Sequence, residues 1–262
     1  MGGNNVAHIQ GEYPIIEVNH GAMVDYTILC PEIARESKAG QFVHIRVPGF
    51  TLRRPISICE VNADKGTLRI LFDIRGEGTR AMADMRVGDM IDIMGPLGNG
   101  FELLDPSKKA VVVGGGIGVP PMLQTAKHYG ENATAIIGFR NKDLIVLEED
   151  FKKQGNPVML CTDDGTAGHH GLVTDLLKQR IEEGPVDIVY ACGPKIMLKY
   201  VALTCKEHGI RCQVSLEERM GCGVGACLVC ACKTRKENGE ETYSHVCKNG
   251  PVFDAEKVVF DE

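Results

Sequence analysis

Residues 108–123 read KKAVVVGGGIGVPPML and join an apolar run to a helical stretch through a glycine-rich turn. Four apolar residues in a row are typical of a strand covered on both faces. The run GIGVPP at 116–121 has the form G-x-G-x-x-P, and Pro121 suits the first turn of a helix. Glycines at Gly116 and Gly118 let the backbone approach a pyrophosphate. The motif also fits a plain tight turn, so its surroundings have to decide.

Those surroundings alternate strand and helix patterns. The runs KAVVV, ATAIIGF, PVMLC, VDIVYAC and RCQVSL alternate with the stretches PPMLQTAKHYG, GLVTDLLKQRIEEG and KIMLKYVALTCKEHG. Repeated strand–helix units predict a doubly wound parallel sheet over residues 105–215. This setting favours a nucleotide-binding role for the glycine turn.

Three further loops follow strands and are expected at the same sheet edge, where ligands of such sheets bind. They are GFRN with Arg140, CTDDG with Asp163, and the C-G-P sequence formed by Cys192, Gly193 and Pro194. Arg140 is expected to reach an adenosine ribose or phosphate, and C-G-P to flank a nicotinamide. Carboxylates there accept from free ribose hydroxyls and repel a 2′-phosphate, which favours NAD(H) over NADP(H). They also fit ordinary turn residues.

Residues 1–104 have a different texture. Short β-type runs (MVDYTILC, QFVHIRV, PISICEV, TLRILFDI and DMIDIMG) are separated by turn formers, which predicts a small antiparallel barrel or sandwich. LRRPISI places two arginines before a strand, and LFDIRGEGTRAM opens a helical stretch at Gly78 and Thr79. An arginine near helix N-terminal amides predicts a second pyrophosphate site, although a basic surface pair is the simpler interpretation.

Residues 216–262 are too few and too polar to build a core alone. Four cysteines follow the order C-x4-C-x2-C-x16-C, the arrangement of plant-type 2Fe–2S centres: Cys222, Cys227, Cys230 and Cys247. Glycines between them let backbone N–H groups approach the sulfurs. The alternative is a zinc ion held by three of these cysteines with His245. Cys232 is interpreted as a bystander on the following strand.

Bulk properties narrow the class of protein. A formal charge of −6 argues against nucleic acid or an anionic membrane as the main partner. No apolar run reaches the roughly 18 residues that span a bilayer, and MGGNNVAHIQ has no secretory-signal pattern. Eleven cysteines, an odd number, argue against a full set of disulfides. We therefore expect a cytoplasmic protein in which the isolated cysteines are small buried hydrophobes.

Together these motifs resemble the ferredoxin–NAD(P)⁺ reductase-like flavoproteins, which carry an FAD-binding barrel with R-x-Y-[ST] and a nucleotide domain with G-x-G-x-x-P and C-G-P. By that resemblance the FAD-binding residues are Arg54, Pro55, Ile56, Ser57, Leu71, Phe72, Asp73, Gly78 and Thr79. Ile56 departs from the motif because it replaces the Tyr that stacks on the flavin.

The sequences RRPISI, GEGT, GGGIGVPPML, YACGP, EERMGCGVGACLVCACK and HVCKNGPVFDAEKVVF are similar, in that order, to one family. It is the electron-transfer subunit of bacterial NAD-dependent dihydroorotate dehydrogenase. The resemblance implies three parts: an FAD barrel (1–104), an NAD domain (105–215) and a 2Fe–2S domain (216–262). It also assigns the four cysteines named above as cluster ligands, and no catalytic residue to this chain.

The resemblance implies a relay in pyrimidine (UMP) biosynthesis. A partner subunit with FMN oxidises dihydroorotate, and electrons cross the cluster and the FAD of this chain to NAD⁺, in a heterotetramer of two plus two chains. One alternative is a flavin/iron–sulfur subunit of another ferredoxin- or sulfide-linked NAD(P)H oxidoreductase. A second is a flavin reductase whose zinc-bound tail is only an interaction module.

Overall fold

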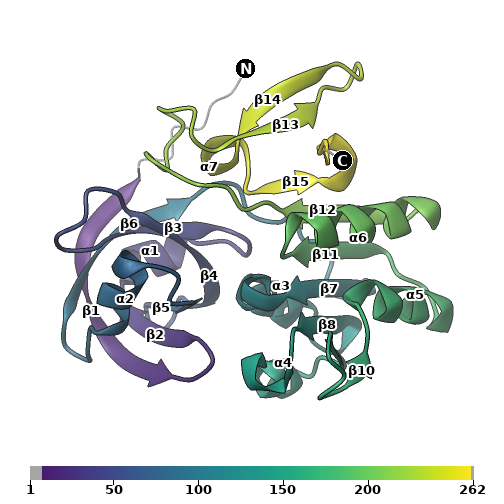
Figure 1. Ribbon diagram of the computed structural model, residues 1–262, viewed down its shortest axis with the longest axis horizontal. Helices are drawn as coiled ribbons and strands as arrows, with labels where there is room; N and C mark the ends of the chain where they lie inside the picture. Colours follow the sequence, from purple (N-terminus) through teal and green to yellow (C-terminus); the bar gives the residue numbers. More distant parts are fainter. Residues whose placement is uncertain (1–7, 261–262) are drawn as a thin grey trace.

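The computed structural model describes residues 8–260. In Figure 1 a barrel and a helix-flanked sheet lie side by side, and a smaller carboxyl-terminal part lies above both. The start of the chain, on which the expectation about a secretory signal rested, lies mostly outside the described residues. Within residues 8–260, no helix is both long enough and apolar enough to span a membrane.

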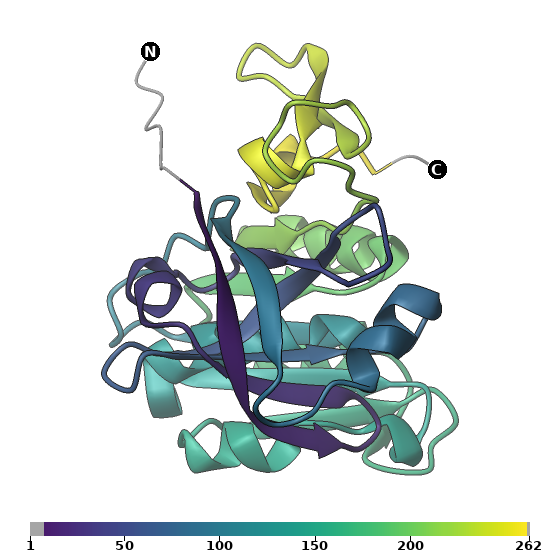
Figure 2. The same cartoon turned by 90° about the vertical axis from the view of Figure 1, so that its left-hand side faces the viewer.

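The amino-terminal part is a closed antiparallel barrel with the strand order β1-β2-β5-β4-β3-β6, which confirms the barrel prediction (Figure 2). Its strands are β1 (Ile9–His20), β2 (Val24–Leu29), β3 (Phe42–Arg46), β4 (Arg54–Asn62), β5 (Thr67–Phe72) and β6 (Met90–Leu97). Two short helices, α1 (Pro31–Glu36) and α2 (Glu77–Ala83), complete this part.

The sequence pattern missed β1. This strand contains Gly11 and Pro14, residues that are depleted in strands. Its first half pairs with β6 and its second half with β2, from Ile15 onward, so one long strand closes the barrel. Tyr13 and Ile15 are buried in the barrel core, and this burial outweighs the poor local propensity.

The second part is a seven-stranded sheet in the order β10-β9-β8-β7-β11-β12-β15. Five of its strands run parallel, as predicted: β7 (Ala110–Gly115), β8 (Ala133–Phe139), β9 (Val158–Thr162), β11 (Ile188–Cys192) and β12 (Arg211–Ser215). The short strand β10 (His169–His170), which the sequence pattern did not predict, adds parallel to β9 at the edge. On one side of β7 the chain adds β8, β9 and β10 in turn, and it then crosses to β11 on the other side of β7. The switch point of this fold, where ligands gather, therefore lies between β7 and β11.

Helices cover both faces of this sheet: α3 (Pro120–Tyr129), α4 (Glu148–Lys153), α5 (Val173–Glu183) and α6 (Lys195–Glu207). Val111 and Val113 of β7 pack in one cluster with residues of α5 and α6. Val112 packs in another, with residues of α3 and α4. Short 3₁₀ turns η1 (Gly116–Gly118), η2 (Gly130–Asn132) and η3 (Lys142–Leu144) link the strands to helices. The apolar run at residues 110–113 is thus buried from both sides.

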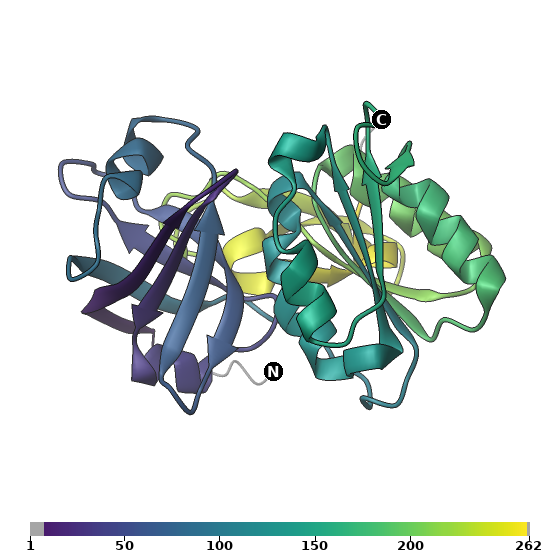
Figure 3. The same ribbon diagram turned by 90° about the horizontal axis from the view of Figure 1, so that it is seen from below.

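The α3 face of the sheet packs against the barrel, and the two bodies lie side by side when seen from below (Figure 3). Arg69 of β5 joins Asp25 of the barrel at 2.7 Å to Asp150 of α4 at 2.6 Å. Glu60 of β4 pairs with Lys127 of α3 at 2.6 Å. Because these pairs are partly buried, they fix the relative position of the two bodies better than surface pairs would.

The carboxyl-terminal part contains the hairpin β13 (Ala231–Arg235) and β14 (Glu241–His245), helix α7 (Val246–Asn249), strand β15 (Val252–Asp254) and the turn η4 (Ala255–Lys257). Strand β15 adds to the central sheet antiparallel to β12, with Val252 opposite Ser215. Val246 and Cys247 belong to the same apolar cluster as α5 and α6. The tail therefore shares the core of the sheet, which explains how so polar a segment folds.

Candidate functional site

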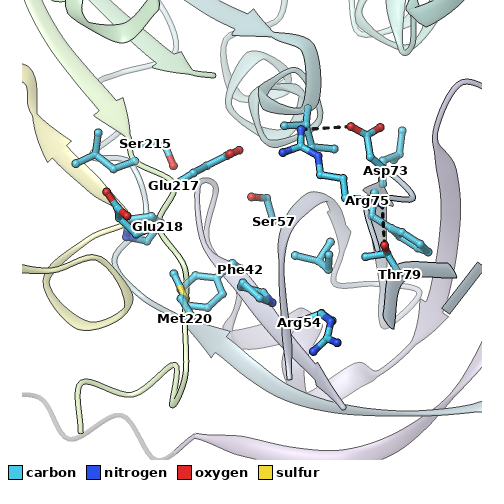
Figure 4. Close-up of a pocket in the computed structure, with 17 residues that line it drawn as sticks. Phe42, Arg54, Ser57, Asp73, Arg75, Thr79, Ser215, Glu217, Glu218 and Met220 are labelled. Carbon is cyan, nitrogen blue, oxygen red and sulfur yellow. Dashed lines mark hydrogen bonds and ion pairs between the residues drawn. The ribbon is translucent and has the colours of Figure 1, made fainter. Parts of the chain in front are cut away.

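A cavity of about 230 Å³, here called the junction pocket, lies where the three parts of the chain meet. Strands β4 and β5 form one wall, Ile117 of the glycine turn contributes from the sheet, and residues 215–220 with Pro251 close it from the tail. Figure 4 shows Ser57, Asp73 and Thr79 on the barrel side and Glu217, Glu218 and Met220 on the tail side. A ligand in this pocket would touch all three parts.

Eight residues predicted from the flavin motifs line this pocket: Arg54, Pro55, Ile56, Ser57, Leu71, Phe72, Asp73 and Thr79. They come together because β4 and β5 are paired neighbours in the barrel. The ninth, Gly78, lies against Arg54, and a Cβ there would collide with the guanidinium. Gly78 thus leaves the space that Arg54 occupies.

Arg54 and Thr79 are held in place by neighbouring groups. The Arg54 guanidinium lies 5.2 Å from the Phe50 ring centroid and donates to the Leu52 carbonyl. Thr79 Oγ1 accepts from the N–H groups of Arg75 at 2.9 Å and Gly76 at 3.2 Å. Positive charge and donors on this wall suit the phosphates of a dinucleotide. Ile56 presents only an aliphatic surface where the family motif has an aromatic ring.

Sequence reasoning missed the tail side of the pocket. Glu217 lines the cavity with an exposed side chain. Desolvation by the surrounding protein raises its pKa; Arg75 opposes this rise and Asp73 adds to it. Phe42 of β3 and Met220 also line the pocket without belonging to the flavin motifs. They meet the flavin-motif residues only through tertiary packing, so no local pattern signals them.

The loops predicted to bind a second nucleotide meet at the carboxyl edge of the sheet, here called the nucleotide edge. Gly114 of β7 pairs with Cys192 of β11. Gly118 lies so close to the Cys192 carbonyl that a Cβ at residue 118 would collide with it. A Cβ at Gly193 would collide with the Met197 side chain and would lie 3.2 Å from the Gly115 nitrogen. The G-x-G turn, with Gly116, and the C-G-P loop, with Pro194, therefore form one surface.

Arg140 and Asp163 follow paired positions of β8 and β9 at the same edge, because Phe139 lies opposite Thr162. The Asp163 N–H donates to the Phe139 carbonyl at 3.0 Å, and both side chains are exposed. The next residue, Asp164, is a turn residue. Its Oδ1 accepts from the N–H and the hydroxyl of Thr166, and these bonds lower its pKa. The structure thus separates two carboxylates that the sequence pattern treated alike.

The four predicted cluster cysteines lie on the tail. Three are carried by residues 216–230, here called the cysteine loop, which contains neither helix nor strand, and Cys247 lies on α7. Cys230 Sγ and Cys247 Sγ are 3.3 Å apart. Cys222 Sγ accepts from the N–H groups of Ala226 at 3.2 Å and Val224 at 3.4 Å. Backbone N–H groups of the loop therefore surround the Cys222 sulfur.

The protonation tendencies of these thiols differ. Burial raises the pKa of Cys222, but N–H groups of the loop lower it more, to about 6. Burial raises the pKa of Cys247, with its neighbour Cys230 adding to the rise. Cys232 lies outside the loop on β13, and burial raises its pKa to about 11. Within residues 8–260, no three His, Cys, Asp or Glu side chains already form a site for a single metal ion. Four thiols, two of which accept from loop N–H groups, fit an iron–sulfur cluster.

Residues 217–259 match the iron–sulfur cluster binding domain of dihydroorotate dehydrogenase B. The chain is 45% identical over 223 residues to the dihydroorotate dehydrogenase B (NAD(+)) electron transfer subunit of Caldanaerobacter subterraneus subsp. tengcongensis, covering 84% of this chain and 87% of that protein. It is 39% identical over 241 residues to the subunit of the same name from Streptococcus mutans serotype c, covering 89% and 92%.

Solved structures agree on the fold. The structure of an NADH-dependent reduced ferredoxin–NADP oxidoreductase, described for flavin-based electron bifurcation, has a TM-score of 0.85 and 30% identity, covering 95% of this chain and 90% of that one. A ferredoxin NADP⁺ reductase from Neisseria gonorrhoeae with bound FAD and NADP has a TM-score of 0.61 and 20% identity, covering 76% and 92%. At 39–45% identity over most of their length, the first two relatives decide the family. The chain belongs to the electron transfer subunits of dihydroorotate dehydrogenase B (NAD(+)).

Proposed function

We infer that this chain is the electron transfer subunit of an NAD-dependent dihydroorotate dehydrogenase, an oxidoreductase of pyrimidine biosynthesis, and that it holds FAD and a 2Fe–2S cluster and uses NAD⁺. The observation that carries the inference is the junction pocket, because it is built jointly by the barrel, the glycine turn and the first residues of the tail. A flavin there would lie between the nucleotide edge and the cysteine loop. This order would let electrons pass from the cluster to the flavin and then to the nicotinamide.

We assign FAD to the junction pocket, with Arg54 and Thr79 toward its phosphates and Ser57, Leu71 and Phe72 against its ring. The residues proposed for NAD(H) are those of the nucleotide edge: Gly116, Gly118, Arg140, Asp163, Cys192, Gly193 and Pro194. The four thiolates of Cys222, Cys227, Cys230 and Cys247 are proposed to hold the cluster. When bound, a flavin exchanges electrons singly with such a cluster and in pairs with a nicotinamide.

The roles of the protein residues follow from their placement. Ile117 carries the glycine turn to the rim of the pocket, so a nicotinamide at the nucleotide edge would approach the flavin from the sheet. Met220 lines the pocket two residues before Cys222, so the tail reaches the cysteine loop directly from the flavin wall. Phe42, Ile56, Leu71 and Phe72 give the pocket an apolar lining that limits water.

The proposed partner is an FMN-containing subunit that oxidises dihydroorotate, in a heterotetramer of two plus two chains. A cytoplasmic location is also proposed, because all eleven cysteines are unpaired and disulfides are rare in reducing compartments. Identity is lower to the ferredoxin–NADP oxidoreductase, at 30%, which favours dihydroorotate over ferredoxin as the electron source.

The test is a tagged copy of this chain, purified anaerobically from its own cells. We expect a co-eluting FMN subunit and dihydroorotate-dependent reduction of NAD⁺, with FAD, two iron atoms and two sulfides per copy of this chain. A brown, flavin-containing eluate without this activity would point to another reductase, identified by its co-eluting subunit. A colourless eluate containing zinc would overturn the cluster assignment.

A further inference from the structure

His44 is a buried histidine whose ring has no hydrogen-bond partner. Its exposed fraction is 0%, and neither Nδ1 nor Nε2 has a partner of hydrogen-bonding geometry. Buried polar side chains normally have a partner, so an unpaired imidazole calls for an explanation. Burial lowers the pKa of His44 to about 4, helped by the charge of Arg53, while the backbones of Arg53 and Cys222 act in the opposite direction. In either protonation state the imidazole ring offers an N–H donor.

The ring lies directly against the cysteine loop. A Cβ on Gly223 would come within 2.5 Å of His44 Nδ1. Gly223 also has a φ of +74°, in the region that favours glycine, so both the conformation and the close contact require this residue. Gly223 follows Cys222. The Cys222 backbone lies close enough to the His44 ring to raise the pKa of the ring.

Strand β3 connects this contact to the junction pocket. Val43 and Ile45 point into the barrel core, whereas Phe42 and His44 lie on the opposite face. Phe42 lines the pocket, and His44 pairs across the ladder with Pro55 of the flavin motif. Strand β3 therefore contributes one residue to the wall of the pocket and another that packs against the cysteine loop.

A second group of contacts holds the far side of the tail to the barrel. Asn99 Nδ2 donates to the carbonyls of Asn249 at 2.9 Å and Lys248 at 3.2 Å, and the Asn99 N–H donates to Gly250 at 2.6 Å. These bonds fix α7, which carries Cys247. On the Cys222 side of the loop, the buried ring of His44 faces the backbone at Gly223.

We propose that His44 is a positioning residue for the iron–sulfur cluster: with the cluster bound, its ring N–H donates to the Cys222 carbonyl. This inference rests on the cluster assignment made above. The bond anchors the loop on β3 and polarises the Cys222–Gly223 peptide, so that the Gly223 N–H becomes a better donor toward the cluster. Donors near a cluster stabilise its more negative, reduced form.

The experiment uses the anaerobically purified complex and an electron paramagnetic resonance redox titration of the cluster. His44→Leu removes the donor at similar volume and is expected to shift the reduction equilibrium about tenfold toward the oxidised form, which is about 59 mV for one electron. His44→Asn places an amide N–H near the position of Nδ1, and His44→Gln places one near Nε2. We expect one of the two to restore most of the shift and thereby to identify the donor nitrogen.

Thr125→Val is the matched control, because Thr125 is also buried with an unpaired polar atom but lies on α3, away from the loop. It should leave the titration unchanged. FAD content reports whether each variant has folded. If His44→Leu loses FAD, the redox titrations of the Asn and Gln variants test whether His44 is the donor. An unshifted titration in His44→Leu, or equal shifts in all three variants, would overturn the role of His44. A wild-type complex with no cluster signal would instead overturn the proposed function.

Discussion

The junction pocket and the cysteine loop are neighbours, but they are held together in different ways. The barrel wall of the pocket consists mainly of paired strands, whose side-chain directions are fixed by the ladder. The cysteine loop has no regular structure and relies on glycines and on N–H groups directed at sulfur. A site built on strands persists without its ligand, whereas a loop site gains much of its order from the metal. Removing a ligand group should therefore disturb the loop far more than the pocket.

The largest effect is expected for Cys227→Ser. Loss of a thiolate ligand should abolish the visible and paramagnetic cluster signals and lower dihydroorotate-dependent NAD⁺ reduction by more than about 100-fold. Most of the FAD should be retained, because Arg54, Ser57 and Thr79 lie on the barrel and only the tail wall of the pocket belongs to the cysteine loop. Cys232→Ser is the control, since Cys232 lies on β13 outside the loop. A normal cluster in Cys227→Ser would refute the ligand assignment.

Arg54→Ala tests the junction pocket, the strand-built site of the comparison. A charge-assisted contact to phosphate contributes about 1.5–3 kcal/mol, so FAD affinity should fall by roughly 10- to 100-fold. The cluster signal should survive, because Arg54 does not touch the loop. Equilibrium dialysis of FAD measures the effect, and Arg46→Ala, an exposed change on β3, serves as the control. Unchanged FAD affinity would leave Arg54 as a surface arginine.

Gly118→Ala perturbs the nucleotide edge and should spare both other sites. The new Cβ would collide with the Cys192 carbonyl, and overpacking of about 1.4 kcal/mol corresponds to about a tenfold loss in kcat/KM for NAD⁺. Gly116→Ala is the comparison, because a Cβ there meets nothing within 4 Å and the substitution suffers only from its φ of +54°. Equal losses in the two variants would count against the packing argument. Steady-state kinetics with a fixed electron donor distinguish them.

The smallest effect is expected at the far end of the same edge. Asp163→Ala should relax the preference for NADH over NADPH by about threefold to tenfold, because a carboxylate that repels the 2′-phosphate is removed. Asp164→Ala should leave that preference unchanged but lower the melting temperature by a few degrees, through loss of its bonds to Thr166. If Asp163→Ala leaves the ratio unchanged, this residue too is only a turn former.

The features that could be predicted from the sequence are those carried by one local segment of the chain, and the features that were missed depend on contacts between distant segments. Strands β7, β8 and β11 could be found because burial on both faces makes them continuous apolar runs, whereas β10, two exposed histidines, leaves no such pattern. Pocket residues inside a motif, such as Arg54 and Thr79, could be found because one local segment carries each of them. Strand β1 was missed because Gly11 and Pro14 hide its pattern. The contributions of Glu217 and His44 could not be predicted, because each matters only through a neighbour far away in the chain.

The pairing of β15 with β12 has a mechanical consequence. Ser215 lies opposite Val252, so the whole cysteine-bearing segment leaves the central sheet and re-enters it at one point. Residues 216–251 therefore form a long connection between two paired strands, and the sheet holds the two ends of this connection together. Local opening of the connection need not break the pairing of the strands that carry it. Opening of the cysteine loop can therefore leave the β12–β15 pairing and the core that the tail shares with the sheet intact.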